Sequence, residues 1–173
     1  MKNYHKILLV ALFCLGASGA QAQTKLFRFV NDRSNLAITT KPNAENPQHL
    51  VGAPRSKENS LSQFFIVLPG VNGGVHINSA SNPLLYLGRN AEGNVVIDSG
   101  KNLQSYSWSI DFAGIGSKNG AVGYCVLSAP EDHTKMLMID AQGQFKLVNV
   151  TGGLPAGQEP NFRFLLETKA DTF

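Results

Sequence analysis

The sequence is poor in the residues that build disulfides and metal sites. It has two cysteines and four histidines among 173 residues. Only Cys125 lies beyond residue 22, in an apolar stretch, so we expect a buried thiol and no intrachain disulfide in the processed chain. The later histidines show no i, i+4 pairing and no cysteine partner at metal-ligand spacing, which predicts no structural metal and no cofactor. These histidines are His49, His76 and His133.

Long hydrophobic runs are also absent. The apolar run from Ile7 to Leu15 breaks at Gly16, short of the roughly 20 residues that span a bilayer. It follows Lys2 and Lys6 and leads to the small residues Ala20-Gln21-Ala22, the order of a secretory signal peptide. An amino-terminal membrane anchor is the alternative. We predict that residues 1–22 are a signal peptide and that the mature chain is secreted, periplasmic or held at the cell surface, without a stable membrane span.

The mature chain has almost no net charge. Removal of Lys2 and Lys6 leaves 13 of the 15 basic residues against 12 acidic ones. There is no basic run and no interleaving of Lys or Arg with aromatic residues, so we expect no nucleic acid as a partner.

Motifs of catalysis are missing as well. Gly116-Ser117 lacks the frame of a hydrolase nucleophile elbow. Asp132 and His133 are neighbours in a polar turn, where adjacent side chains usually point apart. Carboxylates distant in sequence can still meet in space, as glycosidase chemistry requires. We predict that the protein is not an enzyme.

What the sequence does contain is short apolar runs separated by Gly, Asn, Pro and Ser. No long stretch keeps the apolar period of a helix, so the pattern predicts an all-β fold of strands joined by tight turns. Residues 23–173 are long enough for one domain. A short helix within residues 54–62 is the one exception that the pattern allows.

The runs recur three times, in repeats of about 24–70, 71–115 and 120–169. The first strands contain Phe29, Ile77 and Val126, and each repeat ends on an aromatic strand. Turns with glycine, 91–94 and 141–144, separate the second and third strands of the last two repeats, whereas the first has a longer polar loop. Three units of four strands indicate a repeat architecture.

This pattern resembles a β-trefoil, and the closing strands resemble those of ricin B-type lectins. That family ends each unit with Gln, any residue and Trp. Here the closing triplets read Gln63-Phe64-Phe65, Tyr106-Ser107-Trp108 and Phe162-Arg163-Phe164. The resemblance implies six strands in a barrel and six in a cap. Another small antiparallel barrel or sandwich is the alternative. The expected core residues are Leu50, Phe65, Leu87, Trp108, Ile139, Leu147 and Phe164.

The resemblance also implies a sugar site in each unit that keeps a carboxylate, an amide and an aromatic ring. At the carboxylate position the units have Thr39, Gly88 and Asp140, and before the closing strand they have Ser62, Ser105 and Asn161. The third unit is therefore the candidate, with Asp140 and Asn161 as polar residues. Val148 occupies the stacking position, so Phe145 or Tyr86 is the substitute ring, although either fits a core position equally. Asp140 also fits an ordinary turn carboxylate that accepts backbone N–H groups.

Two functions follow as hypotheses. The first is a non-catalytic carbohydrate-binding module that recognises a glycan or a cell-surface polysaccharide through the third unit. The second is a protein-binding trefoil, for example a protease inhibitor or a surface interaction module. It would act through the long polar loops at residues 40–48 and 52–62. A degenerate trefoil with a structural role on an envelope surface is a third reading.

Overall fold

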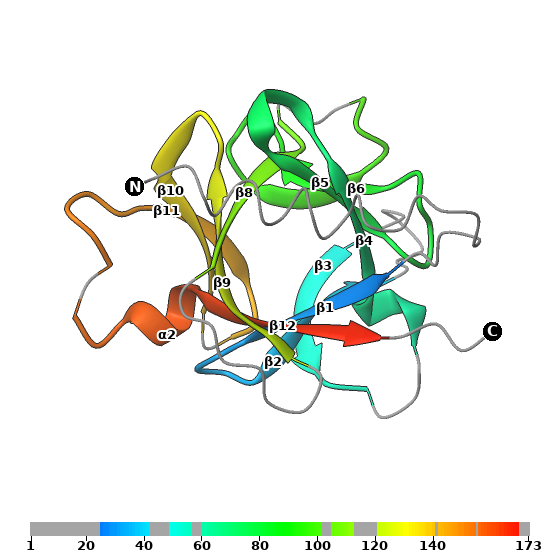
Figure 1. Cartoon of the computed structure of the whole chain (residues 1–173), viewed down its shortest axis with the longest axis horizontal. Helices are drawn as coiled ribbons and strands as arrows, with labels where there is room; N and C mark the ends of the chain where they lie inside the picture. Colours follow the sequence, from blue (N-terminus) through cyan, green and yellow to red (C-terminus); the bar gives the residue numbers. More distant parts are fainter. Residues whose placement is uncertain are drawn as a thin grey trace, which may run out of the picture.

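The computed structural model describes residues 25–41, 49–56, 60–101, 105–112, 121–140, 142–154 and 156–169. The predicted signal peptide therefore lies outside the described residues. Within them, twelve strands follow in three groups of four (Figure 1). The strands are β1 Leu26–Asn31, β2 Leu36–Lys41, β3 His49–Pro54, β4 Phe65–Pro69, β5 Val75–Ser79, β6 Tyr86–Arg89, β7 Val95–Asp98, β8 Ser107–Phe112, β9 Ala121–Ala129, β10 Asp132–Ile139, β11 Phe145–Asn149 and β12 Arg163–Lys169.

Three short helices interrupt these strands. They are the 3₁₀ helices η1 (Leu61–Gln63) and η2 (Val71–Gly73) and the α-helix α2 (Glu159–Phe162). The short helix expected within residues 54–62 is η1, whose last residue lies one position beyond that range. The loop expected at 52–62 begins later than predicted, because Gly52 to Pro54 pair with β2 as the end of strand β3. The loop at 40–48 begins after Lys41, and residues 42–48 lie outside the described part.

Six of the strands pair in a closed circuit. Strand β1 pairs with β4, β4 with β5, β5 with β8, β8 with β9, β9 with β12, and β12 again with β1. All of these pairs are antiparallel. Closure leaves the barrel strands without a free edge. The chain's first and last described strands therefore lie side by side, with Phe29 opposite Leu166.

The other six strands form three hairpins, β2–β3, β6–β7 and β10–β11. Each hairpin attaches to the barrel through one strand, and β3, β7 and β11 contact one another. The predicted arrangement of three four-stranded units, with a barrel and a hairpin cap, is confirmed.

The core lies inside the barrel and beneath the cap. Every other residue of the barrel strands points inward, as the two-residue period of a strand requires. Five of the seven expected core residues are buried, and Leu50 and Leu147 pack against them half-buried. The buried five are Phe65, Leu87, Trp108, Ile139 and Phe164. Trp108 also donates its indole N–H to the carbonyl of Leu87 at 2.9 Å, which satisfies the polar atom of this buried ring.

Cys125 faces the same core on strand β9 and is fully buried. Burial, and secondarily the carboxylate of Asp111, raises the pKa of the Cys125 thiol to about 12. The expectation of a buried thiol is confirmed.

The glutamine of the first closing triplet, Gln63, connects several segments of the first unit by hydrogen bonds. Gln63 is 3% exposed and donates to Thr39 Oγ1 at 3.1 Å and to the carbonyl of Pro54 at 2.8 Å, while its oxygen accepts the N–H of Ser56 at 2.8 Å. It thus joins η1 to both strands of the β2–β3 hairpin and to the residues that follow.

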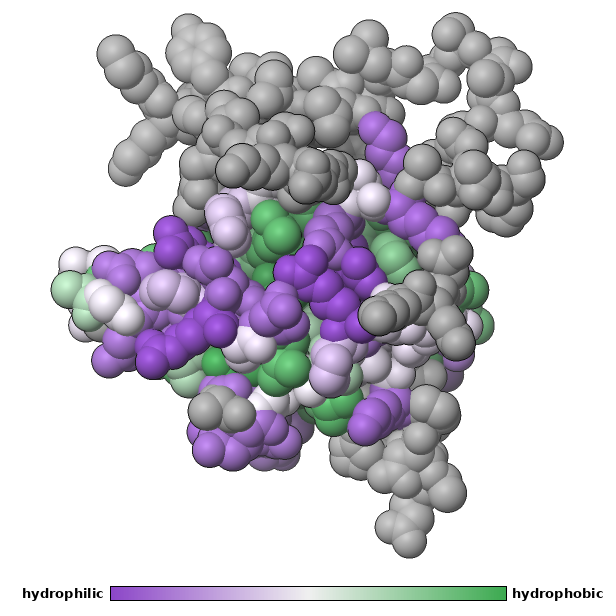
Figure 2. All heavy atoms as spheres, turned by 90° about the horizontal axis from the view of Figure 1, so that it is seen from below, coloured by the Kyte–Doolittle hydropathy of each residue, from purple (hydrophilic) through white to green (hydrophobic). Residues whose placement is uncertain are grey.

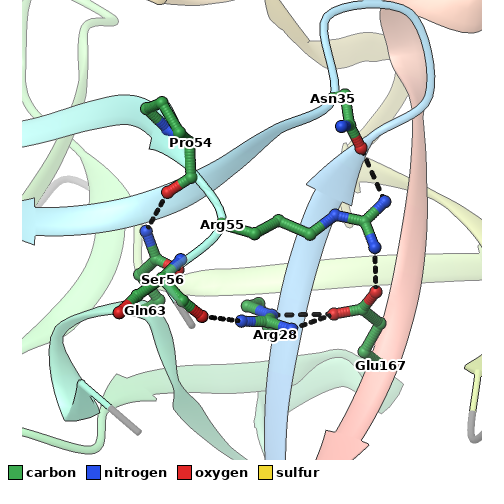
Figure 3. A network of polar contacts seen from close by, with 7 residues as sticks. All are labelled: Arg28, Asn35, Pro54, Arg55, Ser56, Gln63 and Glu167. Carbon is green, nitrogen blue, oxygen red and sulfur yellow. Dashed lines mark hydrogen bonds and ion pairs between the residues drawn. The ribbon is translucent and has the colours of Figure 1, made fainter. Parts of the chain in front are cut away.

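A network of charged side chains continues from this point (Figure 3). Arg28 on β1 donates to the carbonyl of Ser56 and pairs with Glu167 on β12 at 2.6 Å. Arg55 pairs with the other oxygen of Glu167 at 2.6 Å and donates to Asn35. These contacts hold the β1–β2 turn, the end of β3 and the last strand together.

Candidate functional site

Asp140 lies at the end of β10 and organises the turn of the β10–β11 hairpin. Its Oδ1 accepts the backbone N–H of Gln142 at 3.0 Å and that of Gln144 at 2.9 Å. Its Oδ2 lies 2.8 Å from Nζ of Lys146. Gly143 completes the turn with φ +77, a left-handed conformation that glycine adopts without strain. The turn role considered for Asp140 is therefore present in the structure.

The second unit builds the same turn with an amide. Asn90 accepts the N–H of Asn94 through its side chain at 2.8 Å, and Gly93 has φ +79. The strand registers agree, because Arg89 pairs with Val95 as Ile139 pairs with Phe145. The counterpart of Asp140 is thus Asn90.

The sequence alignment of the units placed Gly88 and Thr39 at this position, and both assignments are wrong. Gly88 lies within β6, opposite Val96. Thr39 lies within β2, where its hydroxyl binds Gln63 and Ala37. The β2–β3 ladder continues past Thr39 to the pair of Lys41 and His49, so Thr39 is not at the end of the strand.

Asp140 and Asn161 line one groove of about 800 Å³. This volume falls in the range of roughly 300–1,000 Å³ that is usual for small-molecule sites. One wall is the β1–β2 turn, with Arg33, Ser34 and Leu36, and the others are the end of β10 and the segment around α2. Among the described residues, the lining consists of Asn31, Arg33, Ser34, Leu36, Met138, Ile139, Asp140, Gln158 and Asn161.

Asn31 holds two of these walls in place. It is 1% exposed, and its side-chain N–H₂ donates to the carbonyls of Pro160, Asn161 and Arg163, at 3.2, 2.8 and 3.3 Å. Its oxygen accepts both the backbone N–H and the hydroxyl of Ser34. One buried amide thus ties the β1–β2 turn to the segment around α2, and a buried, fully bonded side chain fixes a site's geometry well.

An ion pair adds to this attachment. Asp32 donates its backbone N–H to the carbonyl of Arg163 at 2.9 Å and pairs with the Arg163 guanidinium at 3.0 Å. Asp32 is therefore directed toward β12, while its neighbour Arg33 lines the groove and is exposed.

The ring proposed for this site lies elsewhere. Phe145 begins β11 and packs half-buried against the hydrophobic core, and it is not among the groove-lining residues. Its role in sugar binding stays a prediction. The described lining residues include no aromatic side chain, and their apolar part is aliphatic, contributed by Leu36, Met138 and Ile139.

The alternative ring, Tyr86, belongs to a cluster in the second unit. Its ring centroid lies 5.9 Å from that of His76 and 5.5 Å from that of Tyr106, and His76 and Tyr106 are 4.7 Å apart. Burial lowers the pKa of the His76 imidazole, whose Nε2 has no hydrogen-bond partner. Tyr106 replaces the family glutamine here and is 36% exposed. This ring cluster is separate from the groove.

Hydrogen bonds keep the carboxyl of Asp140 ionised. The largest effect comes from the hydrogen bond that Lys146 donates, and the next from the backbone N–H of Gln144; both lower the pKa of the Asp140 carboxyl below its usual value. Asp140 is thus ionised near neutral pH, with Lys146 balancing its charge.

No three His, Cys, Asp or Glu side chains in the described part of the chain are grouped so that they hold a metal ion. No helix there has the length and hydropathy to cross a bilayer. On the face viewed from below, hydrophilic residues predominate, including on the side where α2 lies (Figure 2).

Known structures share this architecture. The chain is similar to a designed 3-fold symmetric protein, ThreeFoil, with a TM-score of 0.59 and 14% identity over 82% of this chain and 97% of that one. It is equally similar to a Macrolepiota procera ricin B-like lectin in complex with lactose, with a TM-score of 0.59 and 12% identity over 86% and 99%. The fold is a β-trefoil. At these identities the likeness establishes the trefoil fold alone.

Some matching proteins are much longer. For an endo-β-galactosidase from Clostridium perfringens that releases GlcNAcα1-4Gal, the TM-score is 0.62 at 13% identity, and the chain covers 34% of that protein. No family model matches the sequence, and no curated protein matches it.

The sequence analysis missed the first-unit wall of the groove. The Asn31-Asp32-Arg33-Ser34-Asn35 segment has the composition of a turn, which is its only local signal. Nothing in the local pattern indicates that this turn lies beside the third unit, because that proximity arises from the pairing of β1 with β12.

Proposed function

We propose that this trefoil is a non-catalytic carbohydrate-binding module that acts through the groove between the β1–β2 turn, the end of β10 and α2. The observation that carries the proposal is that Asp140 and Asn161, two polar residues expected from the third unit, line one groove. Leu36 and Met138 offer half-buried apolar surface against which the C–H face of a sugar ring packs. The lactose complex of a similar lectin agrees with this reading.

The groove predicts weak binding of single sugars. Hydrogen bonds to hydroxyl groups largely exchange against those with water, and the part of the lining that the structure describes has no aromatic platform. We therefore expect a Kd of about 1 mM or weaker for a monosaccharide, and tighter binding of oligosaccharides that fill the groove.

A glycan array with the purified protein tests this function. Asn161→Ala removes an amide that lines the groove and is expected to abolish the signals. Asn149→Ala, an exposed asparagine on β11, is the matched control and is expected to keep them. A silent array, or signals that both variants retain, contradicts the proposal. Reducing-end assays on bound oligosaccharides are expected to show no cleavage.

The proposed role also includes export. We expect the protein isolated from its host to begin at Gln23, outside the cytoplasm, because the sequence before it has the order of a signal peptide. Amino-terminal sequencing checks this expectation, and a retained residue 1–22 segment contradicts it.

A further inference from the structure

The groove has an unbalanced positive charge. Its charged lining residues within the described part of the chain are Arg33 and Asp140. Asp140 is neutralised by Lys146 at 2.8 Å. Arg33 has no ion pair or hydrogen bond among the described residues, and its neighbour Asp32 is paired with Arg163 instead. Among the described residues, the uncompensated charge in the groove is therefore the positive charge of the Arg33 guanidinium.

The groove also offers more hydrogen-bond donors than acceptors. The Oδ1 of Asp140 already accepts two backbone N–H groups, and its Oδ2 accepts from Lys146. Asn31, although it borders the groove, uses its amide for Ser34 and the α2 segment. The groups left for a ligand are the guanidinium of Arg33 and the side-chain amides of Gln158 and Asn161, which have no hydrogen bond within the described residues.

The position of Arg33 is well determined by its turn. Both flanking residues are anchored, Asp32 through Arg163 and Ser34 through the buried Asn31. Asn35, with φ 57, closes the turn by donating its N–H to the carbonyl of Asn31 at 3.0 Å. A side chain on so constrained a turn loses less conformational entropy when it binds a ligand than one on a free loop does.

We propose that the groove selects saccharides that carry a carboxylate, such as uronic or sialic acids, and that Arg33 binds this carboxylate. The inference rests on the proposed carbohydrate-binding function and assigns its ligand class. A planar guanidinium donates two parallel hydrogen bonds to the two oxygens of a carboxylate. The hydroxyl groups of a neutral sugar do not accept this pair of bonds in the same way. Gln158 and Asn161 bind ring hydroxyls, and Leu36 and Met138 contact the apolar ring face. The charge anchor replaces the aromatic ring that the lining lacks.

The ligand series for the test pairs each acid with its own neutral form. Saccharides with uronic or sialic acids are compared with their methyl esters, which keep the ring stereochemistry and remove the charge. We expect binding of at least one acid to exceed that of its ester by about tenfold, since hydrogen bonds between charged partners are the strong ones. The preference is expected to weaken as NaCl is raised.

Variants then assign the preference to one residue. Arg33→Gln is expected to lower affinity for the acid to that of its ester and to leave ester binding unchanged. Arg33→Lys keeps the positive charge but not the planar guanidinium. Its affinity for the acid is expected to lie between those of the wild type and Arg33→Gln. Lys101→Gln removes one exposed positive charge in the second unit and is the control, expected to change neither affinity.

Each outcome separates the two proposals. Equal binding of acids and esters, or an acid preference that Arg33→Gln leaves intact, overturns the assignment of Arg33 but keeps a carbohydrate-binding module. The absence of binding to every acid, ester and neutral saccharide overturns both.

Discussion

The Nζ of Lys146 lies 2.8 Å from the Oδ2 of Asp140 across the β10–β11 hairpin. This contact lowers the pKa of the Asp140 carboxyl, together with the N–H groups of the turn that its other oxygen accepts. The carboxylate therefore has a structural role in the hairpin turn, although it also lines the groove. A test of function that truncates Asp140 to alanine disturbs this turn as well as the groove.

The first prediction concerns pH. A carboxyl whose pKa is lowered on folding contributes stability that is present above its unfolded pKa, about 3.9 for Asp, and lost as pH falls through the lower folded value. Asp140→Asn keeps an acceptor for the turn and removes this titration. We expect the unfolding free energy of the variant to fall less than that of the wild type between pH 5 and pH 2. Urea denaturation at each pH measures both free energies.

Glu92→Gln controls for the loss of one negative charge, because Glu92 is an exposed carboxylate in the equivalent turn of the second unit. An Asp140→Asn profile that parallels the wild-type profile at all pH values contradicts this role of Asp140.

The second prediction compares two glycines with the same backbone conformation. An added Cβ at Gly143 lies 3.0 Å from the carbonyl oxygen of Gly52, whereas at Gly93 it meets nothing within 4 Å. Gly93→Ala is expected to cost about 1 kcal/mol of unfolding free energy for its positive φ. Gly143→Ala is expected to cost at least about 1 kcal/mol more, because the clash is with backbone.

Urea denaturation of both variants measures the difference. The Gly143 carbonyl also accepts the N–H of Gly52 at 2.9 Å, so the clash separates the first and third units. Equal losses of unfolding free energy in the two variants contradict the claim that the hairpin turn of the third unit packs tightly against the first unit.

The third prediction concerns the buried glutamine. Gln63→Leu removes three hydrogen bonds, those that Gln63 donates to Thr39 Oγ1 and to the carbonyl of Pro54 and the one that it accepts from the N–H of Ser56. An intramolecular hydrogen bond contributes about 1 kcal/mol, so we expect a total loss of about 3 kcal/mol. Gln142→Leu makes the same exchange at an exposed glutamine and is expected to change stability by less than about 0.5 kcal/mol. Similar thermal unfolding of the two variants contradicts the role given to Gln63.

The fourth prediction concerns the thiol of Cys125. With its pKa raised to about 12 by burial, the thiol is neutral at pH 8 and does not act as a nucleophile. We expect iodoacetamide to leave Cys125 unmodified in the folded protein and to alkylate it fully in 6 M guanidinium chloride. Peptide mass mapping reports the modification, and rapid alkylation of the native chain shows that strand β9 opens readily.

Much of this fold was predictable because each strand carries a local pattern. The alternation around Phe29, Ile77 and Phe164 identifies core strands without any knowledge of their partners. Gly93 and Gly143 likewise identify their own hairpin turns. The period of the repeats then gives the architecture, because three such units bury their apolar faces only by packing together.

The site was less predictable for two physical reasons. Its first wall, with Asn31 and Arg33, reaches the third unit through barrel closure, which depends on pairing between residues more than a hundred positions apart. The counterpart of Asp140 was misplaced because it was taken from the aligned apolar runs, which gave Gly88, whereas the matched turns 91–94 and 141–144 correspond to Asn90. The sequence left Phe145 open between a ring for the ligand and a core position, and in the structure it packs against the core.

The most direct test of the central claim is an NMR titration of the ¹⁵N-labelled protein with the saccharide that gives the strongest array signal. The proposed function predicts that the largest shift changes fall on the backbone amides of Ser34, Met138 and Asn161, from the three walls of the groove, and that Asn161→Ala abolishes them. Shift changes that gather instead around His76, Tyr86 and Tyr106, or no changes at millimolar ligand, contradict the claim that this groove is the binding site.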